Sequence, residues 1–395
     1  MSTSRLLAAL LGLGLAAAAF AQSPAPSPAP VPPPAAATPI PDAPQLSARS
    51  YVLMDFATGR VLAERDASAR VEPASLTKMM TSLIVFEEID AGRLGLDTPV
   101  TISEKAWRTG GSKMFVEVGK QVTVSDLLMG LIVQSGNDAT VALAEQVAGS
   151  EDAFAQMMNA AAAKLGMTDT HFVNADGLPD PEHYTTARDM ALLSHALIAQ
   201  HPEAYEWYAV REFTFNGITQ HNRNSLLWRE AGVDGIKTGH TEGAGYCLAA
   251  SAVRDDMRLI AVVMGAASEK IRAQEALSLL NYGFRFFESH TVYAAGTEVA
   301  APPIWKSELD TLPLGVAEPL VVTIPRGRYQ ALQASMDLPR QLVAPVAKGA
   351  RVGSVNLTLG GEPVASAPLV ALAEAPEAGF FGRLVDGFWM WWESD

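Results

Sequence analysis

Hydrophobic and polar residues in the first part of the chain follow two different periods. Residues 51–55 and 60–63 are rich in strand-forming side chains and flank Thr58-Gly59, so they predict a β-hairpin. After Pro73, a residue favoured in the first turn of a helix, apolar residues recur at helical spacing. This second pattern predicts a helix that buries Leu76, Met79, Met80, Leu83 and Ile84.

Helical spacing returns further along the chain. Ser125 precedes a second apolar stretch of this kind and is expected to cap its helix, and another helix is expected over 138–147. A later helix is expected to bury Ala273, Ala276, Leu277 and Leu280.

Three strands are expected between these helices, at 235–239, 246–253 and 257–264. The last two are joined across Asp255-Asp256, which predicts a tight turn. Strands and helices in this order predict an α+β fold over 46–288, in which helices pack on an antiparallel sheet. Short Val, Leu and Ala runs interrupted by Gly and Pro predict a small β-rich domain over 289–373.

Composition narrows the class of protein. The chain has 395 residues, of which 49% are hydrophobic and 18% charged, values typical of globular proteins. A net charge of −14 without a basic run disfavours nucleic acid as a partner. The single cysteine, Cys247, excludes an internal disulfide and is expected to be a buried strand residue. The 7 histidines form no metal-binding motif, which argues against a histidine-built metal centre. No metal or organic cofactor is expected.

The N-terminus predicts export. Residues 1–21 contain Arg5, an apolar stretch and a small-x-small site at Ala19-Phe20-Ala21, the pattern of a cleaved signal peptide. Residues 22–45 are rich in Pro and Ala, which predicts an extended linker. The mature protein is therefore expected to be exported.

The C-terminus predicts a membrane contact. Charged residues interrupt its apolar run, so the segment is poorly suited to span a bilayer. An amphipathic helix over 374–395, lying on inner-membrane lipid with its aromatic side chains buried, is expected instead. Its apolar residues are Phe380, Phe381, Leu384, Val385, Phe388, Trp389, Trp391 and Trp392.

Candidate chemistry begins at Ser75-Leu-Thr-Lys78, near the start of the helix after Pro73. Residues three apart lie on one helical face, so the amine of Lys78 can lie beside the hydroxyl of Ser75. A serine becomes nucleophilic when a base takes its proton. An amine can be that base only if burial or a neighbouring cation lowers its pKa.

Two later motifs fit the same chemistry. Ser135-Gly-Asn137 lies at an expected break between helices, where its hydroxyl can relay protons and its amide can hold a substrate carbonyl. Lys237-Thr-Gly239 lies on an expected strand, and its cation and hydroxyl suit an anionic substrate group. Gly239 leaves room for the ligand backbone. Lys237 is also expected to be the like charge that lowers the pKa of Lys78.

The three motifs in this order resemble the active-site set of penicillin-binding proteins and serine β-lactamases. Their context resembles the low-molecular-mass D-alanyl-D-alanine carboxypeptidases of the penicillin-binding protein five/six type, from about Leu46 to the C-terminus. The resemblance implies a β-lactamase/transpeptidase-like catalytic domain, with a helical subdomain, over 46–288. It also implies that the exported protein is located in the periplasm. The matching stretches are 73–79, 134–139, 166–172, 233–241, 282–287 and 324–328.

This resemblance implies a two-step acyl transfer. Ser75 would attack the carbonyl between two D-alanines of a peptidoglycan stem pentapeptide, with Lys78 as the general base. Ser135, hydrogen-bonded to Lys78 and Lys237, would pass a proton to the leaving D-alanine. β-Lactam antibiotics would acylate Ser75 as covalent inhibitors.

The resemblance also implies the substrate-binding residues. Asn137 would hold the substrate amide. Lys237 and Thr238, together with Arg272, would hold the terminal carboxylate. The backbone N–H groups of Ser75 and His240 would form the oxyanion hole.

Three alternatives stay open. A serine β-lactamase shares these motifs, although no Glu-x-x-Leu-Asn stretch lies between Ser135 and Lys237 and Ser-Gly-Asn replaces Ser-Asp-Asn. A peptidoglycan DD-endopeptidase would cut crosslinked stems. A non-catalytic wall-binding protein would act through its β-rich domain. Rapid penicillin turnover would identify the β-lactamase, and cleavage of crosslinked dimers would identify the endopeptidase. A Ser75→Ala variant that behaves like the wild type would identify the non-catalytic protein.

Overall fold

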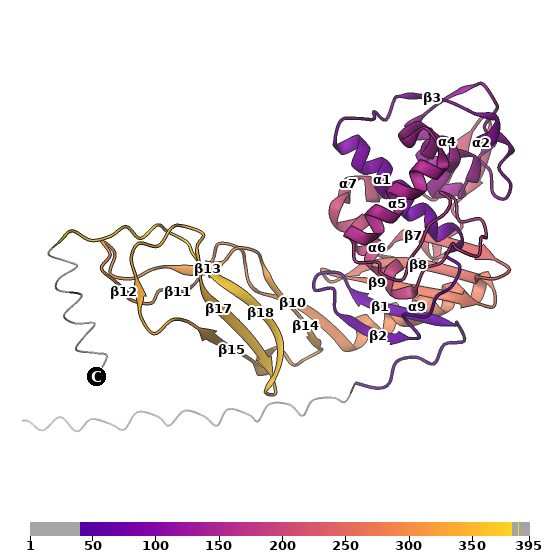
Figure 1. Cartoon of the computed structure of the whole chain (residues 1–395). Helices are drawn as coiled ribbons and strands as arrows, with labels where there is room; N and C mark the ends of the chain where they lie inside the picture. Colours follow the sequence, from indigo (N-terminus) through magenta and orange to yellow (C-terminus); the bar gives the residue numbers. More distant parts are fainter. Residues whose placement is uncertain (1–39, 381–385, 387–395) are drawn as a thin grey trace, which may run out of the picture. The chain divides into compact units, whose positions relative to one another are not determined.

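The computed structural model describes residues 40–380 and residue 386 (Figure 1). The predicted signal peptide (1–21), most of the predicted linker and most of the predicted C-terminal helix lie outside the described residues. The predicted start of that helix at 374 is wrong, because 374–379 are not helical and Ala375 and Glu377 form β-bridges with Val346 and Ser307. Within residues 40–380 and 386, no helix has both the length and the apolar character that a membrane crossing requires.

A five-stranded antiparallel sheet forms the centre of the first part of the fold, in the order β2-β1-β9-β8-β7. The predicted hairpin is present as β1 (Ser50–Asp55) and β2 (Val61–Arg65). The three strands predicted further along are β7 (Val233–Thr241), β8 (Gly245–Arg254) and β9 (Met257–Ala266).

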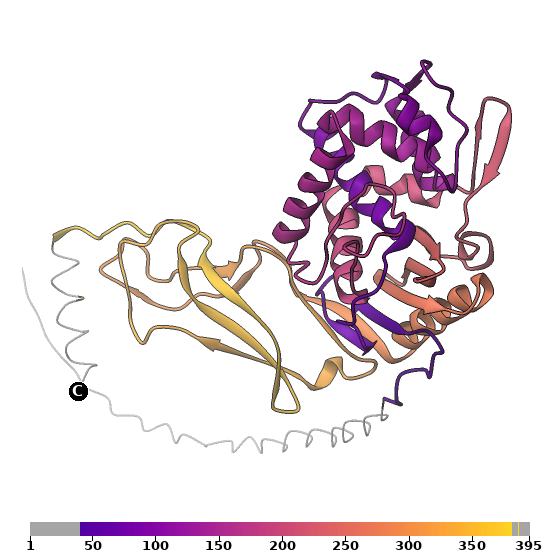
Figure 2. The same cartoon turned by 45° about the vertical axis from the view of Figure 1, so that its right-hand side comes forward.

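Both faces of this sheet are covered by helices, as Figures 1 and 2 show. Because strand side chains alternate between faces, neighbouring residues of β1 enter different cores. Leu53 packs in the core that contains Leu280 of α9 (Glu269–Phe286), whereas Val52 packs in the core that contains Met79 of α1 (Thr77–Asp90). The strands therefore consist of almost continuous apolar runs.

The helices on the α1 side also support the candidate motifs. They are α2 (Glu104–Arg108), α3 (Val124–Met129), α4 (Asn137–Ala148), α5 (Glu151–Lys164), α6 (Ala187–Gln200) and α7 (Pro202–Tyr205). The short α8 (Leu226–Arg229) instead buries Leu226 and Leu227 in the core that contains Leu280. Short hairpins lie among them, formed by β3 (Pro99–Thr101) with β4 (Gln121–Thr123) and by β5 (Glu212–Phe215) with β6 (Ile218–His221).

The predicted cap of α3 is wrong by two residues. Thr123, not Ser125, is the N-cap, because its backbone is extended and its hydroxyl accepts a hydrogen bond from the N–H of Asp126. Ser125 lies inside the helix, where its hydroxyl lies 3.0 Å from that of Thr123.

The chain after α9 is rich in strands, as expected. Its largest sheet has the order β11-β13-β18-β17-β15, and β10 pairs with β14 in a separate ladder. The strands are β10 (Phe287–Tyr293), β11 (Glu298–Ala300), β12 (Ile304–Trp305), β13 (Leu314–Val316), β14 (Leu320–Pro325), β15 (Leu332–Asp337), β16 (Leu342–Val343), β17 (Arg351–Leu359) and β18 (Glu362–Ala371).

Candidate active site

Ser75 lies in a 3-10 turn, Ala74–Leu76, that leads directly into α1. Ala74 has a φ of 50°, in the left-handed region that side chains other than glycine rarely adopt. Such strained backbone is concentrated at functional sites. The turn brings the Oγ of Ser75 to 3.1 Å from the Nζ of Lys78, so the predicted serine–lysine contact is present.

Lys78 is completely buried and its amine has three partners. Besides Ser75, the Nζ donates to the side-chain oxygen of Asn137 at 2.7 Å and to the backbone carbonyl of Asp176. Burial lowers the pKa of Lys78 to about 8, assisted by the cation of Arg223 and opposed by Asp176 and Asp138. A neutral amine is therefore accessible near neutral pH.

Burial, more than a neighbouring charge, lowers the pKa of Lys78. The expected repulsion between Lys237 and Lys78 is present, and it acts on the pKa of Lys237. The pKa of Lys237 is itself well below its usual value, first because Lys237 is buried and then because Lys78, Arg223 and Arg272 repel its charge.

The predicted helix break at Ser135 is present. A π-helical turn, Gly130–Gln134, ends at Ser135, whose φ is 64°, and α4 begins at Asn137. The Oγ of Ser135 is buried and has no hydrogen-bond partner among the described residues. The expected hydrogen bonds from Ser135 to Lys78 and Lys237 are thus absent, because Lys78 is turned toward Asn137 and Asp176.

Asn137 joins the lysine to the loop that precedes the motif. Its Oδ1 accepts from Lys78 and its Nδ2 donates to the carbonyl of Gly110 at 2.7 Å. The next residue, Asp138, accepts hydrogen bonds from the backbone N–H groups of Met114, Phe115 and Val116. The loop around Gly110 is therefore held against the site by two consecutive side chains.

β7 carries the third motif past the nucleophile. A methyl group at Gly239 would lie 3.3 Å from the backbone nitrogen of Ser75, so glycine allows the strand and the turn to approach closely. Arg272, only 4% exposed, donates to the carbonyl of Gly239 at 3.2 Å. The ring of His240 stacks on that of Tyr246, with centroids 4.0 Å apart.

These elements surround a cavity of about 370 Å³. Predicted site residues that line it are Ser75, Ser135, Thr238, Gly239, His240 and Arg272. Lys78 is connected to this lining by its hydrogen bond to Ser75, and Asn137 by its hydrogen bond to Lys78. Lys237 lies buried beside Thr238. Residues that the sequence did not single out also line it: Gly111, Ser112, Arg223, Tyr246 and Glu269.

Cys247 is not part of the cavity lining. Its side chain is fully buried on β8, and burial raises the pKa of its thiol to about 11. The expectation of a small buried strand residue is met.

An arginine cluster gives the cavity its charge. Arg223 and Arg272 both line it, and both repel the buried amine of Lys237. A cavity lined by a serine hydroxyl and these cations suits a ligand with a reactive carbonyl and a carboxylate.

Comparison with known proteins agrees with this arrangement. Residues 37–268 match the family described as D-alanyl-D-alanine carboxypeptidase, and residues 287–377 match the C-terminal domain of penicillin-binding protein 5. The D-alanyl-D-alanine carboxypeptidase DacA of Escherichia coli (strain K12) is 48% identical over 88% of this chain and 89% of its own.

Solved structures are similar too. Penicillin-binding protein 5 from Haemophilus influenzae has a TM-score of 0.81 and 42% identity, covering 87% of this chain and 100% of its own. Penicillin-binding protein D2 from Listeria monocytogenes, solved in its ampicillin-bound form, has a TM-score of 0.56 and 32% identity, covering 60% of this chain and 98% of its own.

Proposed function

The chain belongs to the D-alanyl-D-alanine carboxypeptidase family, and from this premise we propose that Ser75 is the nucleophile with which it removes the terminal D-alanine from peptidoglycan stem pentapeptides. The observation that carries this proposal is the 3.1 Å distance between the Oγ of Ser75 and the Nζ of Lys78. Burial of that lysine supplies the lowered pKa that a general base requires.

The partners of Lys78 suit the first step. A neutral amine has two N–H bonds and one lone pair. When the N–H bonds point to the Oδ1 of Asn137 and the carbonyl of Asp176, the lone pair is left for the proton of Ser75. The Ser75 oxygen then forms a bond to the substrate carbonyl carbon, and the carbonyl oxygen becomes an oxyanion.

The second half of the reaction breaks the bond to the terminal D-alanine. The leaving amine must gain a proton, and Ser135, whose buried hydroxyl lines the same cavity, is proposed to deliver it from Lys78. Water then attacks the ester on Ser75, which releases the shortened stem and returns the proton to the serine.

The remaining residues are proposed to bind the substrate. Thr238, Lys237 and Arg272 would hold the terminal carboxylate. Arg223 also lines the cavity, which supports a role for its guanidinium group in holding the same carboxylate. Asn137 would hold the substrate amide after exchanging one of its present partners. The close approach of Gly239 to Ser75 supports an oxyanion hole formed by the N–H groups of Ser75 and His240.

β-Lactams are proposed to acylate Ser75 and to form an ester that water hydrolyses so slowly that the enzyme stays inhibited. The ampicillin-bound form of the Listeria monocytogenes relative supports this part of the proposal. Rapid catalytic turnover of penicillin would instead indicate a β-lactamase.

The test is release of D-alanine from diacetyl-Lys-D-Ala-D-Ala. The wild-type protein should release D-alanine and form a long-lived adduct with benzylpenicillin. Ser75→Ala should lose both activities by a factor of at least about 1000, as expected when a nucleophile is removed. Ser278→Ala, on the exposed side of α9, is the matched control and should behave like the wild type. An active Ser75→Ala variant would contradict the proposal.

The cellular location is proposed on the sequence and the family. A cleaved signal peptide would deliver the protein to the periplasm, where its substrate lies. Its aromatic C-terminal segment would attach it to the outer face of the inner membrane.

A further inference from the structure

Residues 175–185 hold the nucleophile turn and the start of α1 from one side. The hydroxyl of Thr81 donates to the carbonyl of Ala175 at 2.6 Å, and Lys78 donates to the carbonyl of Asp176. A methyl group at Gly177 would lie 1.9 Å from the carbonyl oxygen of Ala74, so the two backbones are in direct contact there. This segment is therefore placed to control where Ser75 and Lys78 lie.

His183 makes another contact from the same segment. It is 2% exposed, and its Nε2 lies 2.8 Å from the Oγ1 of Thr77. The Nδ1 accepts a hydrogen bond of 3.0 Å from the backbone N–H of Val173, so in the neutral ring the proton is on Nε2. The ring therefore donates to Thr77, which lies between Ser75 and Lys78 in the chain.

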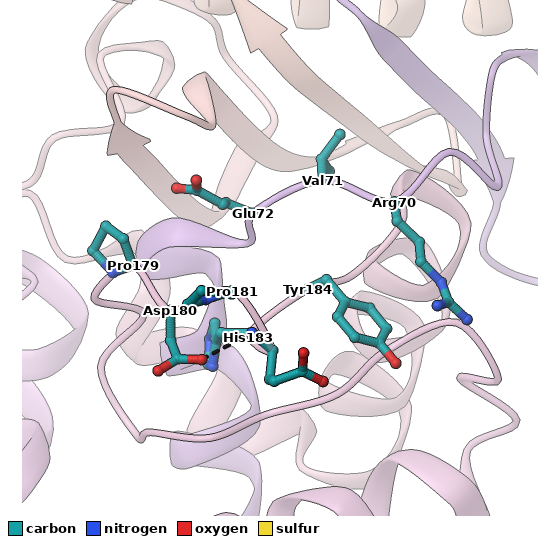
Figure 3. A pocket seen from close by; sticks show the side chains of 9 residues that line it. Arg70, Val71, Glu72, Pro179, Asp180, Pro181, His183 and Tyr184 are labelled. Atoms are coloured by element: carbon teal, nitrogen blue, oxygen red, sulfur yellow. Dashed lines mark hydrogen bonds between the residues drawn. The ribbon is translucent and has the colours of Figure 1, made fainter.

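The surroundings keep this ring neutral. Figure 3 shows His183 on the loop that carries Pro179, Asp180 and Tyr184, around a neighbouring cavity of about 710 Å³. Burial lowers the pKa of His183 to about 4, Asp180 opposes the shift, and His171 and Lys78 add to it. The donor on Nε2 is thus present throughout the range in which Lys78 titrates.

We propose that His183 is a positioning residue of the acylation step, which through its hydrogen bond to Thr77 keeps the Oγ of Ser75 within reach of the Nζ of Lys78. The inference rests on the proposed role of Ser75. Thr77 is the first residue of α1, so a change in its position moves the serine before it and the lysine after it in relation to each other. The histidine itself touches neither substrate nor reacting atoms.

Thr77→Val removes the acceptor while keeping the shape of the side chain. We expect the rate constant for acylation of Ser75 by benzylpenicillin to fall about tenfold, which equals about 1.4 kcal/mol in the barrier. The dissociation constant of the non-covalent penicillin complex should stay within twofold. Thr77→Ser keeps the hydroxyl and should retain at least half of the wild-type rate constant.

Two histidine variants complete the test, one of them as part of a double-mutant cycle with Thr77→Val. His183→Leu should lower the acylation rate constant as Thr77→Val does, and the Thr77→Val/His183→Leu double variant should be no slower than the slower single variant. His183→Gln offers an amide donor to Thr77 and should recover at least a third of the wild-type rate constant.

Thr81→Val separates positioning from stability. It removes a buried hydrogen bond from the same segment to α1 but does not change the contact at Thr77. A loss of acylation in Thr81→Val equal to that in Thr77→Val, at equal melting temperature, would overturn the inference, as would a wild-type rate in Thr77→Val. A wild-type protein that penicillin does not acylate would instead contradict the proposed function of Ser75.

Discussion

The side-chain oxygen of Asn137 accepts a hydrogen bond of 2.7 Å from the Nζ of Lys78, and this acceptor is uncharged. Asn137→Asp would place a carboxylate there and raise the pKa of Lys78, since an opposite charge favours the ammonium form. A rise of about one unit would lower penicillin acylation at pH 7 about tenfold. The pH profile of the acylation rate constant measures this shift.

Asn137→Ala is the matched control, because it removes the same hydrogen bond without adding charge. It should slow acylation while leaving the midpoint of the pH profile near that of the wild type. Equal midpoints in Asn137→Asp and Asn137→Ala would show that charge at this position does not set the protonation of Lys78.

The wild-type pH dependence follows from the same lysine. The pKa of Lys78 is about 8, and only the neutral amine can take the proton of Ser75. Acylation by benzylpenicillin should therefore rise about tenfold per pH unit below pH 8 and level off above it. Stopped-flow measurements between pH 5.5 and 9.5 would check this, and a plateau reached already at pH 6 would be inconsistent with Lys78 as the base.

Gly177 offers a test of the backbone contact beside the nucleophile. Its φ is 88°, and a methyl group there would lie 1.9 Å from the carbonyl oxygen of Ala74. Gly177→Ala should therefore lower the free energy of unfolding by about 3 kcal/mol and slow acylation as the turn is displaced.

Gly166→Ala is the control for Gly177→Ala. Gly166 has a φ of 76° with nothing within 4 Å of an added methyl group, so it reports backbone strain alone. It should cost about 1 kcal/mol in urea unfolding and leave acylation unchanged. Equal effects of the two substitutions would mean that the contact with Ala74 is unimportant.

The C-terminal segment can be tested by deletion. Removing 379–395 should give an active protein that no longer sediments with lipid vesicles. The segment has one basic residue, Arg383, against Asp386, Glu393 and Asp395, so its aromatic side chains must supply the attraction. Full-length protein should accordingly bind zwitterionic vesicles and stay bound in about 1 M salt. Vesicle binding by the truncated protein would refute the tether.

Local spacing made the serine–lysine contact predictable. Residues three apart at the start of a helix lie on one face, so Ser75 and Lys78 could be paired before any tertiary contact was known. The strand positions followed from their apolar runs in the same way. The helix cap was harder, because Thr123 and Ser125 are both suitable residues and backbone conformation decides between them.

Contacts between distant segments could not be obtained from spacing. No motif points to Arg223, which reaches the cavity only because the chain before α8 folds beside β7. The carbonyl of Asp176 is a partner of Lys78 through its backbone, which side-chain patterns do not reveal. The hydrogen bonds expected for Ser135 are absent, since the amine of Lys78 donates to Asn137 and to the carbonyl of Asp176.

The inaccessible thiol of Cys247 has a practical use. Since it is the single cysteine and lies fully inside β8, maleimide reagents should find no target on the folded wild-type protein. A cysteine introduced at an exposed position near Gly177, such as Leu178→Cys, would then be a unique attachment point for a fluorophore or spin label. Movements of the loop beside the nucleophile could be followed by spectroscopy without first engineering a cysteine-free background.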